Sequence, residues 1–301
     1  MNGLFDGRQV RRAFSRASSA YASAASLQHE VEDRLLEMLD FLALQPGRGQ
    51  DWTPARVLDL GSGPARGAQA MRRRWPRAQV IAMDLALPML RQAGVGRWHP
   101  LRRPLARVCA DARALPLADD SLDVLFCNLC LQWVEDLPAV FAGFRRVLRP
   151  GGLLLCSSFG PATLHELREA FAAADAAPHV NPFTSIAEFG DALVQAGFRD
   201  PVLDRDVQVH GYASMGALMR ELRAIGATNA LAARRRSLTG RRRFAAAQAA
   251  YEALRPAGGP LPATWETITA MAWAPDHGAP MREGDAEIAR FPARGIPVRR
   301  R

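Results

Sequence analysis

Acidic residues and glycines in the first half of the chain stand where the cofactor site of an α/β protein would need them. Asp59 lies in a short apolar run at residues 57–60, and Gly61-Ser62-Gly63 follows directly. Glycines allow a tight turn and let a ligand approach the bare main chain, which a Cβ would obstruct. Residues 66–72 then read as the start of a helix, whose N-terminal amides would face that ligand. This strand, turn and helix predict the first crossover of a nucleotide-binding α/β fold.

Three later apolar runs also end in polar side chains. Asp84 follows the second run, about 20 residues beyond Gly63, where a Rossmann-type site places the carboxylate that accepts ribose hydroxyls. Asp111 ends the third run and Asn128 ends the fourth. The carboxyl ends of parallel strands share one edge of a sheet, and open α/β sheets bind ligands at that edge. We therefore expect these side chains to lie in one site.

The arrangement resembles the class I S-adenosylmethionine-dependent methyltransferases, whose first motif is an acid, a variable residue and Gly-x-Gly-x-Gly. Asp59 precedes the glycines by two, and an acid follows the third strand as well as the second. The resemblance implies S-adenosylmethionine as cofactor, with its methionine part against Gly61 and Gly63, its ribose on Asp84 and its adenine amine on Asp111. The cofactor site implied in this way consists of Asp59, Gly61, Ser62, Gly63, Asp84, Leu85, Asp111, Ala112 and Asn128.

One residue departs from that motif, because Ala65 stands at the position of the third glycine. Alanine keeps its amide donor but adds a methyl group. We expect this methyl group either to crowd the site or to require a slightly different turn.

Length and composition limit the remaining alternatives. At 301 residues and 49% hydrophobic residues, the chain can form one large α/β domain with an inserted lid, or two small domains. No apolar run approaches about 18 residues, so we expect no transmembrane helix. No apolar segment follows the first arginines, so the N-terminus does not read as a secretory signal. These features predict a cytoplasmic protein.

The cysteines and histidines do not predict a metal or disulfide framework. Cys127 and Cys130 form a C-x-x-C pair, but no second pair accompanies it. We expect Cys109, Cys127 and Cys156 to lie in buried strands. The six histidines show no metal-ligand spacing, and no metal is expected.

The positive charge consists of arginine alone. The net charge is +9, and the sequence contains no lysine. Much of this charge would be solvated surface, but arginine clusters would attract a polyanion through their summed field. Either nucleic acid or an acidic carrier protein could be that partner. The clusters lie at residues 72–74, 234–236 and 241–243.

The rest of the sequence predicts the elements that hold the site. After a disordered start, residues 12–42 carry the apolar stripe of one or two amphipathic helices, and a linker follows at 46–50. Further helices are expected at 66–74, 86–93, 138–148, 163–174 and 185–196, with a surface loop at 97–104. The later strands are expected at 153–158, 200–209 and 262–273, with helices at 214–255 before the last of them.

With the resemblance, these elements predict an α/β fold. It is a Rossmann-like seven-stranded methyltransferase sheet with an N-terminal helical segment and a helical lid inserted before the last strand. We divide the chain into an N-terminal helical cap (1–50), an S-adenosylmethionine-binding α/β domain (51–211), a helical substrate lid (212–260), the last strand (261–274) and a weakly ordered tail (275–301).

Segments outside the general cofactor site resemble a narrower family, the malonyl-acyl-carrier-protein O-methyltransferases of biotin synthesis (BioC family). The similarity covers about residues 12–273, and residues 128–133 and 225–228 are its most specific parts. It implies methyl transfer to the free carboxylate of a malonyl thioester, giving an ester that fatty-acid synthesis elongates as a pimeloyl precursor. The segments are Phe14-Ser15-Arg16-Ala17 with Tyr21 and Leu27-Gln28, residues 128–133, 157–160 with 164–167, and 222–229. The turn at residues 149–152 resembles many class I methyltransferases more generally.

That chemistry agrees with the residues at hand. A sulfonium methyl group is already activated and a malonyl carboxylate is ionised at neutral pH, so the reaction needs alignment and desolvation more than a base. A cation that holds one carboxylate oxygen would orient the other, and we expect Arg223 in the lid to be that cation, unless it is a solvated helix residue. Tyr21 would close the pocket, although plain packing would also explain it. No catalytic residue is certain. The expected substrate residues are Tyr21, Gln28, Gln132, Trp133 and Arg223.

The expected partner is an acidic acyl-carrier protein that carries malonyl, steered by arginines near 234–243, with malonyl-coenzyme A as an alternative substrate. No membrane and no nucleic acid partner is expected, because no basic stripe with interleaved aromatic residues is present. Three other readings stay open. They are a methyltransferase of the same fold for another small acid or a quinone precursor, an RNA methyltransferase, and, because of Ala65, a binding or assembly factor without catalysis.

Overall fold

The computed structural model describes residues 3–40, 53–93, 104–237 and 240–276, and the backbone of 281–283 and 286–288. The predicted linker at 46–50, most of the loop at 97–104 and most of the tail lie outside these residues.

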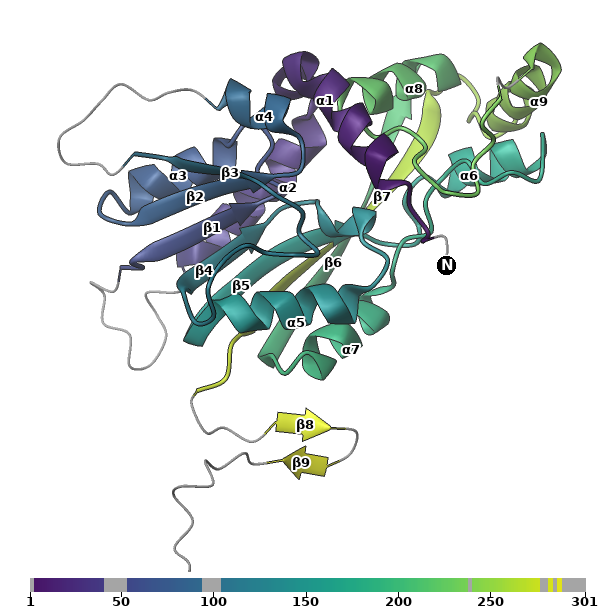
Figure 1. Ribbon diagram of the computed structural model, residues 1–301. Helices are drawn as coiled ribbons and strands as arrows, with labels where there is room; N and C mark the ends of the chain where they lie inside the picture. Colours follow the sequence, from purple (N-terminus) through teal and green to yellow (C-terminus); the bar gives the residue numbers. More distant parts are fainter. Residues whose placement is uncertain are drawn as a thin grey trace, which may run out of the picture.

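A seven-stranded mixed sheet forms the centre of the molecule (Figure 1), as predicted. Its strand order is β3-β2-β1-β4-β5-β7-β6, and β7 runs antiparallel to both of its neighbours. The strands are β1 (Arg56–Leu60), β2 (Gln79–Asp84), β3 (Ala106–Cys109), β4 (Leu122–Cys127), β5 (Leu148–Phe159), β6 (Arg199–Tyr212) and β7 (Leu261–Trp273).

Alternation along β1 supplies the core on both faces of the sheet. Leu58 and Leu60 pack in one cluster with the aromatic residues of α5 (Leu137–Val147) and α7 (Ile186–Gln195). Val57 packs in a second cluster with residues of α2 (Ser26–Met38) and α3 (Arg66–Arg74). Successive side chains of a strand point to opposite faces, so a continuous apolar run fits a sheet that is covered on both sides.

The N-terminal helix α1 (Gly7–Ala24) begins earlier than the sequence analysis predicted, so the expectation of disorder through residue 12 is wrong. Asp6 caps this helix by accepting a hydrogen bond from the Gln9 amide at 3.1 Å, and it also pairs with Arg234 at 2.9 Å. Two backbone hydrogen bonds further hold the start of α1 to the later chain, from the Asp6 amide to the Ala230 carbonyl and from the Ala232 amide to the Leu4 carbonyl. Helix α1 packs against α4 (Leu87–Gln92) and α8 (Met215–Ala224).

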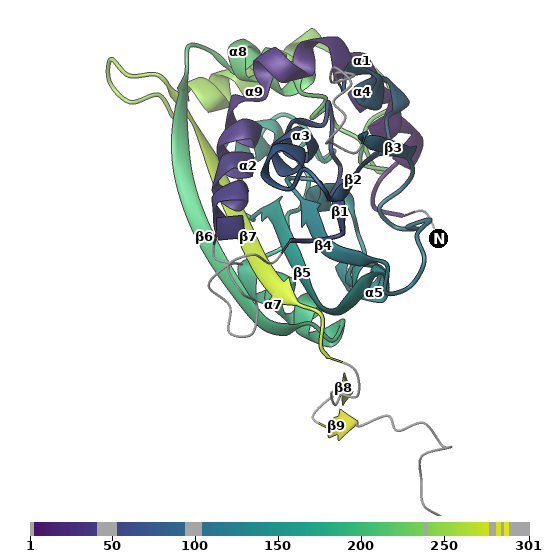
Figure 2. The same ribbon diagram turned by 90° about the vertical axis from the view of Figure 1, so that its left-hand side faces the viewer.

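The helices between β6 and β7 form the predicted insertion. Helices α8 and α9 (Arg241–Glu252) pack with α6 (His165–Ala172) around a separate apolar cluster that includes the fully buried Tyr251. Figure 2 shows α1, α4 and α8 together at one end of the sheet. The insertion and the N-terminal helices therefore cover the same end of the molecule.

Several boundaries and one burial prediction differ from the structure. Strand β5 begins at Leu148, which pairs with Leu122, although its regular pairing with β4 starts only at Leu153 after an irregularity. Strand β6 extends to Tyr212. Cys127 and Cys156 are buried as predicted, but Cys109 is exposed because β3 is an edge strand whose residues alternate between half-buried and exposed. Within the segment that was predicted as a tail, β8 (Met281–Glu283) pairs antiparallel with β9 (Ala286–Ile288). No helix in the described part of the chain is long and apolar enough to cross a membrane.

Candidate cofactor and substrate site

The turn after β1 has the backbone that the glycines were expected to provide. Gly61 and Gly63 have φ angles of 68° and 51°, in the left-handed region that favours glycine. A Cβ on Gly61 would lie 2.6 Å from the Cβ of Cys130, so only glycine fits between the turn and residue 130. The Gly63 amide donates to Oδ2 of Asp84 at 2.9 Å, which ties this turn to the end of β2.

Ala65 continues the turn in the left-handed conformation, with φ 63° and ψ 38°. Its side chain is fully buried in the apolar cluster that contains Leu35 and Val57, and it lines none of the hollows described below. The expected crowding of the site is therefore wrong. Instead, a non-glycine residue holds a conformation that costs an L-residue backbone strain.

Asp59 is only 2% exposed and serves the helix that follows the turn. Its Oδ2 accepts a hydrogen bond from the Ala68 amide at 2.7 Å, in the first turn of α3. Burial raises the pKa of Asp59 well above its ordinary value, and the charge of Glu32 adds to this effect. A buried acid at a helix N-terminus is favourably placed when ionised, because the helix dipole is positive there.

A first hollow of about 840 Å³ lies over the carboxyl ends of β1, β2 and β4. Asp84 lines it, and both oxygens of this carboxylate accept backbone amides, from Gly63 and from Ala86. Burial raises the pKa of Asp84. The structure brings most of the predicted cofactor residues to this hollow, namely Gly61, Gly63, Asp84, Leu85, Asp111 and Ala112.

Asp111 is half-buried and already paired. Its two oxygens accept hydrogen bonds from Arg113 at 3.0 and 2.6 Å, and Arg113 lowers the pKa of Asp111. The carboxylate therefore stays ionised at the rim of the hollow. Arg113 also lines the hollow, and sequence reasoning missed it because nothing in its spacing distinguishes it from other arginines.

A second, small hollow of about 350 Å³ adjoins the same turn and is strongly charged. It is lined by Asp59, Ser62 and Asn128 of the predicted site, and also by Glu32 and Arg66. Arg66 pairs with Glu32, and burial raises the pKa of Glu32 against the effect of this partner. The hydroxyl of Ser62 is buried without a hydrogen-bond partner, so a polar group is still lacking at this point. No sequence pattern indicated Glu32, which comes from α2.

Asn128 is held by the protein at both ends of its amide. Its Nδ2 donates to the Gln28 carbonyl at 2.9 Å, and its Oδ1 accepts from the Ser157 hydroxyl at 2.8 Å. Ser157 in turn accepts from the Leu129 amide. This chain of hydrogen bonds joins α2, β4 and β5, so Asn128 lies at the predicted edge and positions its neighbours.

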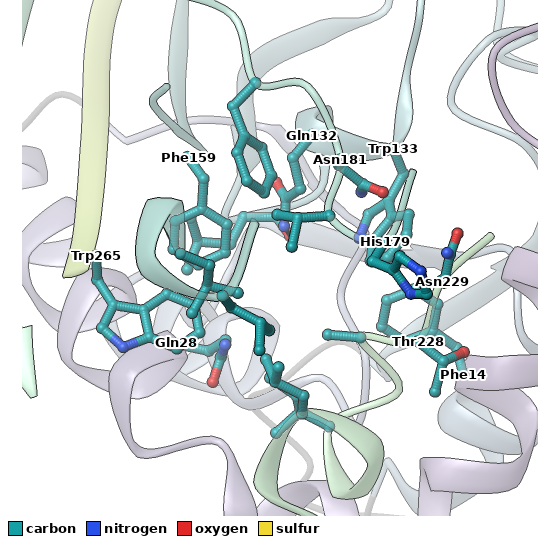
Figure 3. Close-up of a pocket in the computed structure, with 18 of the residues that line it drawn as sticks. Phe14, Gln28, Gln132, Trp133, Phe159, His179, Asn181, Thr228, Asn229 and Trp265 are labelled. Atoms are coloured by element: carbon teal, nitrogen blue, oxygen red, sulfur yellow. Dashed lines mark hydrogen bonds between the residues drawn. The ribbon is translucent and has the colours of Figure 1, made fainter. Parts of the chain in front are cut away.

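A third hollow of about 700 Å³ lies beside the first, and Leu222 and Ile225 at the end of α8 line it. Figure 3 shows side chains that line this hollow. Four of the predicted substrate residues line it, namely Tyr21, Gln28, Gln132 and Trp133. Oε1 of Gln132 and Oγ1 of Thr228 are buried without hydrogen-bond partners. Because buried polar atoms are normally paired, these two indicate a site for a polar ligand.

Arg223 is the predicted substrate residue that the structure does not bring to this hollow. It is exposed on α8, whereas Leu222 and Ile225 on either side of it face the hollow. One residue of a helix corresponds to about 100° of rotation, so a neighbour of an inward residue points elsewhere. Sequence reasoning also missed His179 and Asn181, which line the hollow from the segment before α7.

Tyr21 lies where the three hollows meet, because it lines all of them. Its pKa is raised, first by burial and then by the charges of Asp84 and Glu32, so the hydroxyl keeps its proton and can donate a hydrogen bond. Phe14 and Trp133 line the first and third hollows with it and pack edge to face, with ring centroids 5.4 Å apart. The described residues contain no group of three or more His, Cys, Asp or Glu side chains that could hold a metal ion.

Known proteins resemble this chain both in sequence and in fold. A family model described as a methyltransferase domain matches residues 58–156. Two solved structures have the same fold at 17% sequence identity. One, a proposed methyltransferase from Bacillus halodurans, has a TM-score of 0.56 and covers 80% of this chain and 98% of its own. The other, the YcgJ protein from Bacillus subtilis, has a TM-score of 0.53 and covers 74% of this chain and 92% of its own.

Relatives of known name match over nearly the whole chain. The malonyl-(acyl-carrier protein) O-methyltransferase of Xylella fastidiosa (strain M23) is 59% identical over 100% of this chain and 99% of its own length. The protein of the same name from Laribacter hongkongensis (strain HLHK9) is 48% identical over 90% of each chain. Both sequence identities are far above the level at which membership of the same family would be in doubt. The chain therefore belongs to the malonyl-(acyl-carrier protein) O-methyltransferase family of S-adenosylmethionine-dependent methyltransferases.

Proposed function

We propose that this protein transfers a methyl group from S-adenosylmethionine to the free carboxylate of a malonyl group that an acyl-carrier protein carries as a thioester. One observation carries the proposal: the first hollow, at the carboxyl edge of the sheet, and the third hollow, under the lid, share Phe14, Tyr21, Leu129 and Trp133. Two ligands that fill these hollows would meet at those side chains. The names of the relatives support the choice of substrate.

The first two hollows fit the cofactor. Asp84 would accept the ribose hydroxyls, and Gly61 and Gly63 would lie against the methionine part. The acidic residues Glu32 and Asp59 line the second hollow, and the unpaired Ser62 hydroxyl there offers a hydrogen bond to a polar group of the cofactor. When bound, the cofactor supplies an already activated methyl group.

The protein's own contribution is alignment and exclusion of water. A malonyl carboxylate is ionised at neutral pH, so no side chain has to remove a proton from it. The walls at the meeting point are mostly aromatic and aliphatic, and they would strip water from the carboxylate and hold it in line with the methyl group. Tyr21 would close this point, with its protonated hydroxyl as a donor.

The carrier protein is the second part of the proposal. Arg234, Arg235 and Arg243 each lie within 4 Å of an acidic group of the chain. Arg236, Arg241 and Arg242 are exposed, and no ion pair is present for them in the described part of the chain. These three could steer an acidic carrier, an effect that weakens with salt. Malonyl-coenzyme A is the alternative substrate, and formation of a pimeloyl precursor for biotin remains part of the proposal.

The division of the chain also remains a proposal. In it, the cap (1–50) and the lid (212–260) enclose the substrate over the cofactor domain (51–211), while 261–274 completes the sheet and 275–301 follows as a tail. The fold supports it, because α1 and α8 pack against each other over one end of the sheet.

The test is methyl transfer from labelled cofactor to a panel of acceptors. We expect malonyl-carrier protein to be methylated, malonyl-coenzyme A to be methylated less efficiently, and acetyl-carrier protein and a short RNA to be inert. Turnover of free small acids or a quinone precursor without response to malonyl thioesters would favour another methyltransferase activity. Calorimetry without detectable binding of S-adenosylmethionine would favour a non-catalytic binding factor.

A further inference from the structure

The substrate hollow contains almost no charge. Among the described residues that line it, His179 is the only side chain that can become positively charged, and none is an acid. A carboxylate is costly to bury without a compensating charge or hydrogen-bond donors. If a malonyl carboxylate enters this hollow, as the proposed function requires, the histidine is the group that can compensate it.

The imidazole of His179 is held in place. Its ring stacks on Phe171 with a centroid distance of 4.1 Å and an interplanar angle of 15°. Its Nε2 lies 2.9 Å from Oδ1 of Asp175, and the side chain is 14% exposed. Since Nε2 is engaged with the carboxylate, Nδ1 is the ring nitrogen that remains for a ligand.

Asp175 is not a partner of His179 alone, because two arginines also lie close to it. Its side chain is 6% exposed, and its Oδ2 lies 3.6 Å from Nε of Arg235 and 3.8 Å from Nε of Arg243. The hydrogen bond from His179 is the main cause that lowers the pKa of Asp175, so this carboxylate stays ionised. With the imidazole protonated, the four groups together carry two positive charges.

We propose that His179 is the residue that recognises the substrate carboxylate, in the role that the sequence analysis assigned to Arg223. As an imidazolium it donates Nε2–H to Asp175 and Nδ1–H to one oxygen of the malonyl carboxylate, which leaves the other oxygen to accept the methyl group. Thr228 lines the same side of the hollow in Figure 3, and its unpaired Oγ1 provides a second donor. This inference deepens the proposed function and rests on it.

The experiment compares two ligands that differ only in the carboxylate. Malonyl-coenzyme A and acetyl-coenzyme A are titrated into the full chain saturated with S-adenosylhomocysteine, and the ratio of the two dissociation constants is the readout. Wild-type protein should prefer malonyl. In His179→Gln this preference should fall at least about tenfold, because a charge-assisted hydrogen bond is lost. Affinity for S-adenosylhomocysteine, which binds the other hollow, should not change.

Two further variants make the result decisive. His165→Gln alters a half-exposed histidine on α6 that lines none of the three hollows described above, and it should keep the malonyl preference. Asp175→Asn should reduce the preference in the same direction, and it serves if the glutamine variant does not fold. An unchanged malonyl preference in the folded His179 or Asp175 variant would overturn the inference. A wild-type protein that methylates no malonyl thioester would instead overturn the proposed function.

Discussion

Replacing Ala65 by glycine tests whether the turn after β1 stores strain. This alanine is fully buried and has φ 63° and ψ 38°. Glycine would adopt the same backbone without steric cost. The matched control is Ala68→Gly, because Ala68 is also fully buried in the same cluster but lies within the right-handed helix α3.

The expected magnitudes follow from three contributions. Relief of the left-handed conformation stabilises Ala65→Gly by about 1–2 kcal/mol. Loss of a buried methyl group costs about 0.8 kcal/mol, and the freer unfolded chain costs about 0.4–1 kcal/mol. The sum lies within about 1 kcal/mol of zero. Ala68→Gly has no relief and loses about 0.8 kcal/mol of burial and about 1 kcal/mol of helix propensity, so it should destabilise by about 2 kcal/mol.

Urea unfolding of the two variants and the wild-type protein measures this difference. We expect Ala65→Gly to unfold close to the wild-type midpoint and Ala68→Gly at a clearly lower urea concentration. Affinity for S-adenosylmethionine should be unchanged in Ala65→Gly, because the methyl group packs in the core and lines no hollow. Equal destabilisation by the two substitutions would refute strain at Ala65.

Three more predictions follow from the site. Burial raises the pKa of Asp59, so the folded protein binds the proton of this carboxyl group more tightly than the unfolded chain does. The free energy of unfolding should therefore fall as the pH rises from about 4 through the raised pKa. Asp59→Asn should remove this part of the fall, which urea unfolding at about pH 5 and about pH 8 would detect. Tyr21→Phe should lower kcat about tenfold or more through loss of one hydrogen bond to a charged group, with S-adenosylmethionine affinity retained in calorimetry. Arg223→Ala should leave steady-state turnover within about twofold of wild type, because the side chain is exposed outside the hollows; a loss of turnover would restore the expectation from sequence.

The sheet and the cofactor edge could be predicted because their signals are local. Each strand is a short apolar run, and the side chain that follows it must lie at the carboxyl edge, as Asp84 and Asp111 do. Turn chemistry likewise identified Gly61 and Gly63. The left-handed Ala65 could not be foreseen in detail, since burial of its methyl group depends on helices α2 and α3.

The substrate side was harder because tertiary packing decides which side chains face inward. On α8, the choice between Arg223 and its neighbours depends on the rotation of the helix against α1, which no local pattern fixes. His179 lies in an irregular segment and reaches the hollow through its contacts with Phe171 and Asp175. The cap on α1 was missed because Asp6 depends on Arg234, more than 200 residues later.

The most direct measurement is mass spectrometry of malonyl-carrier protein after incubation with the enzyme and cofactor that carries a deuterated methyl group. We predict one labelled methyl on the malonyl unit, released as methanol by mild alkaline hydrolysis, as an ester of the free carboxylate requires. A malonyl unit that remains unlabelled, or a label on the carrier polypeptide instead, would contradict it.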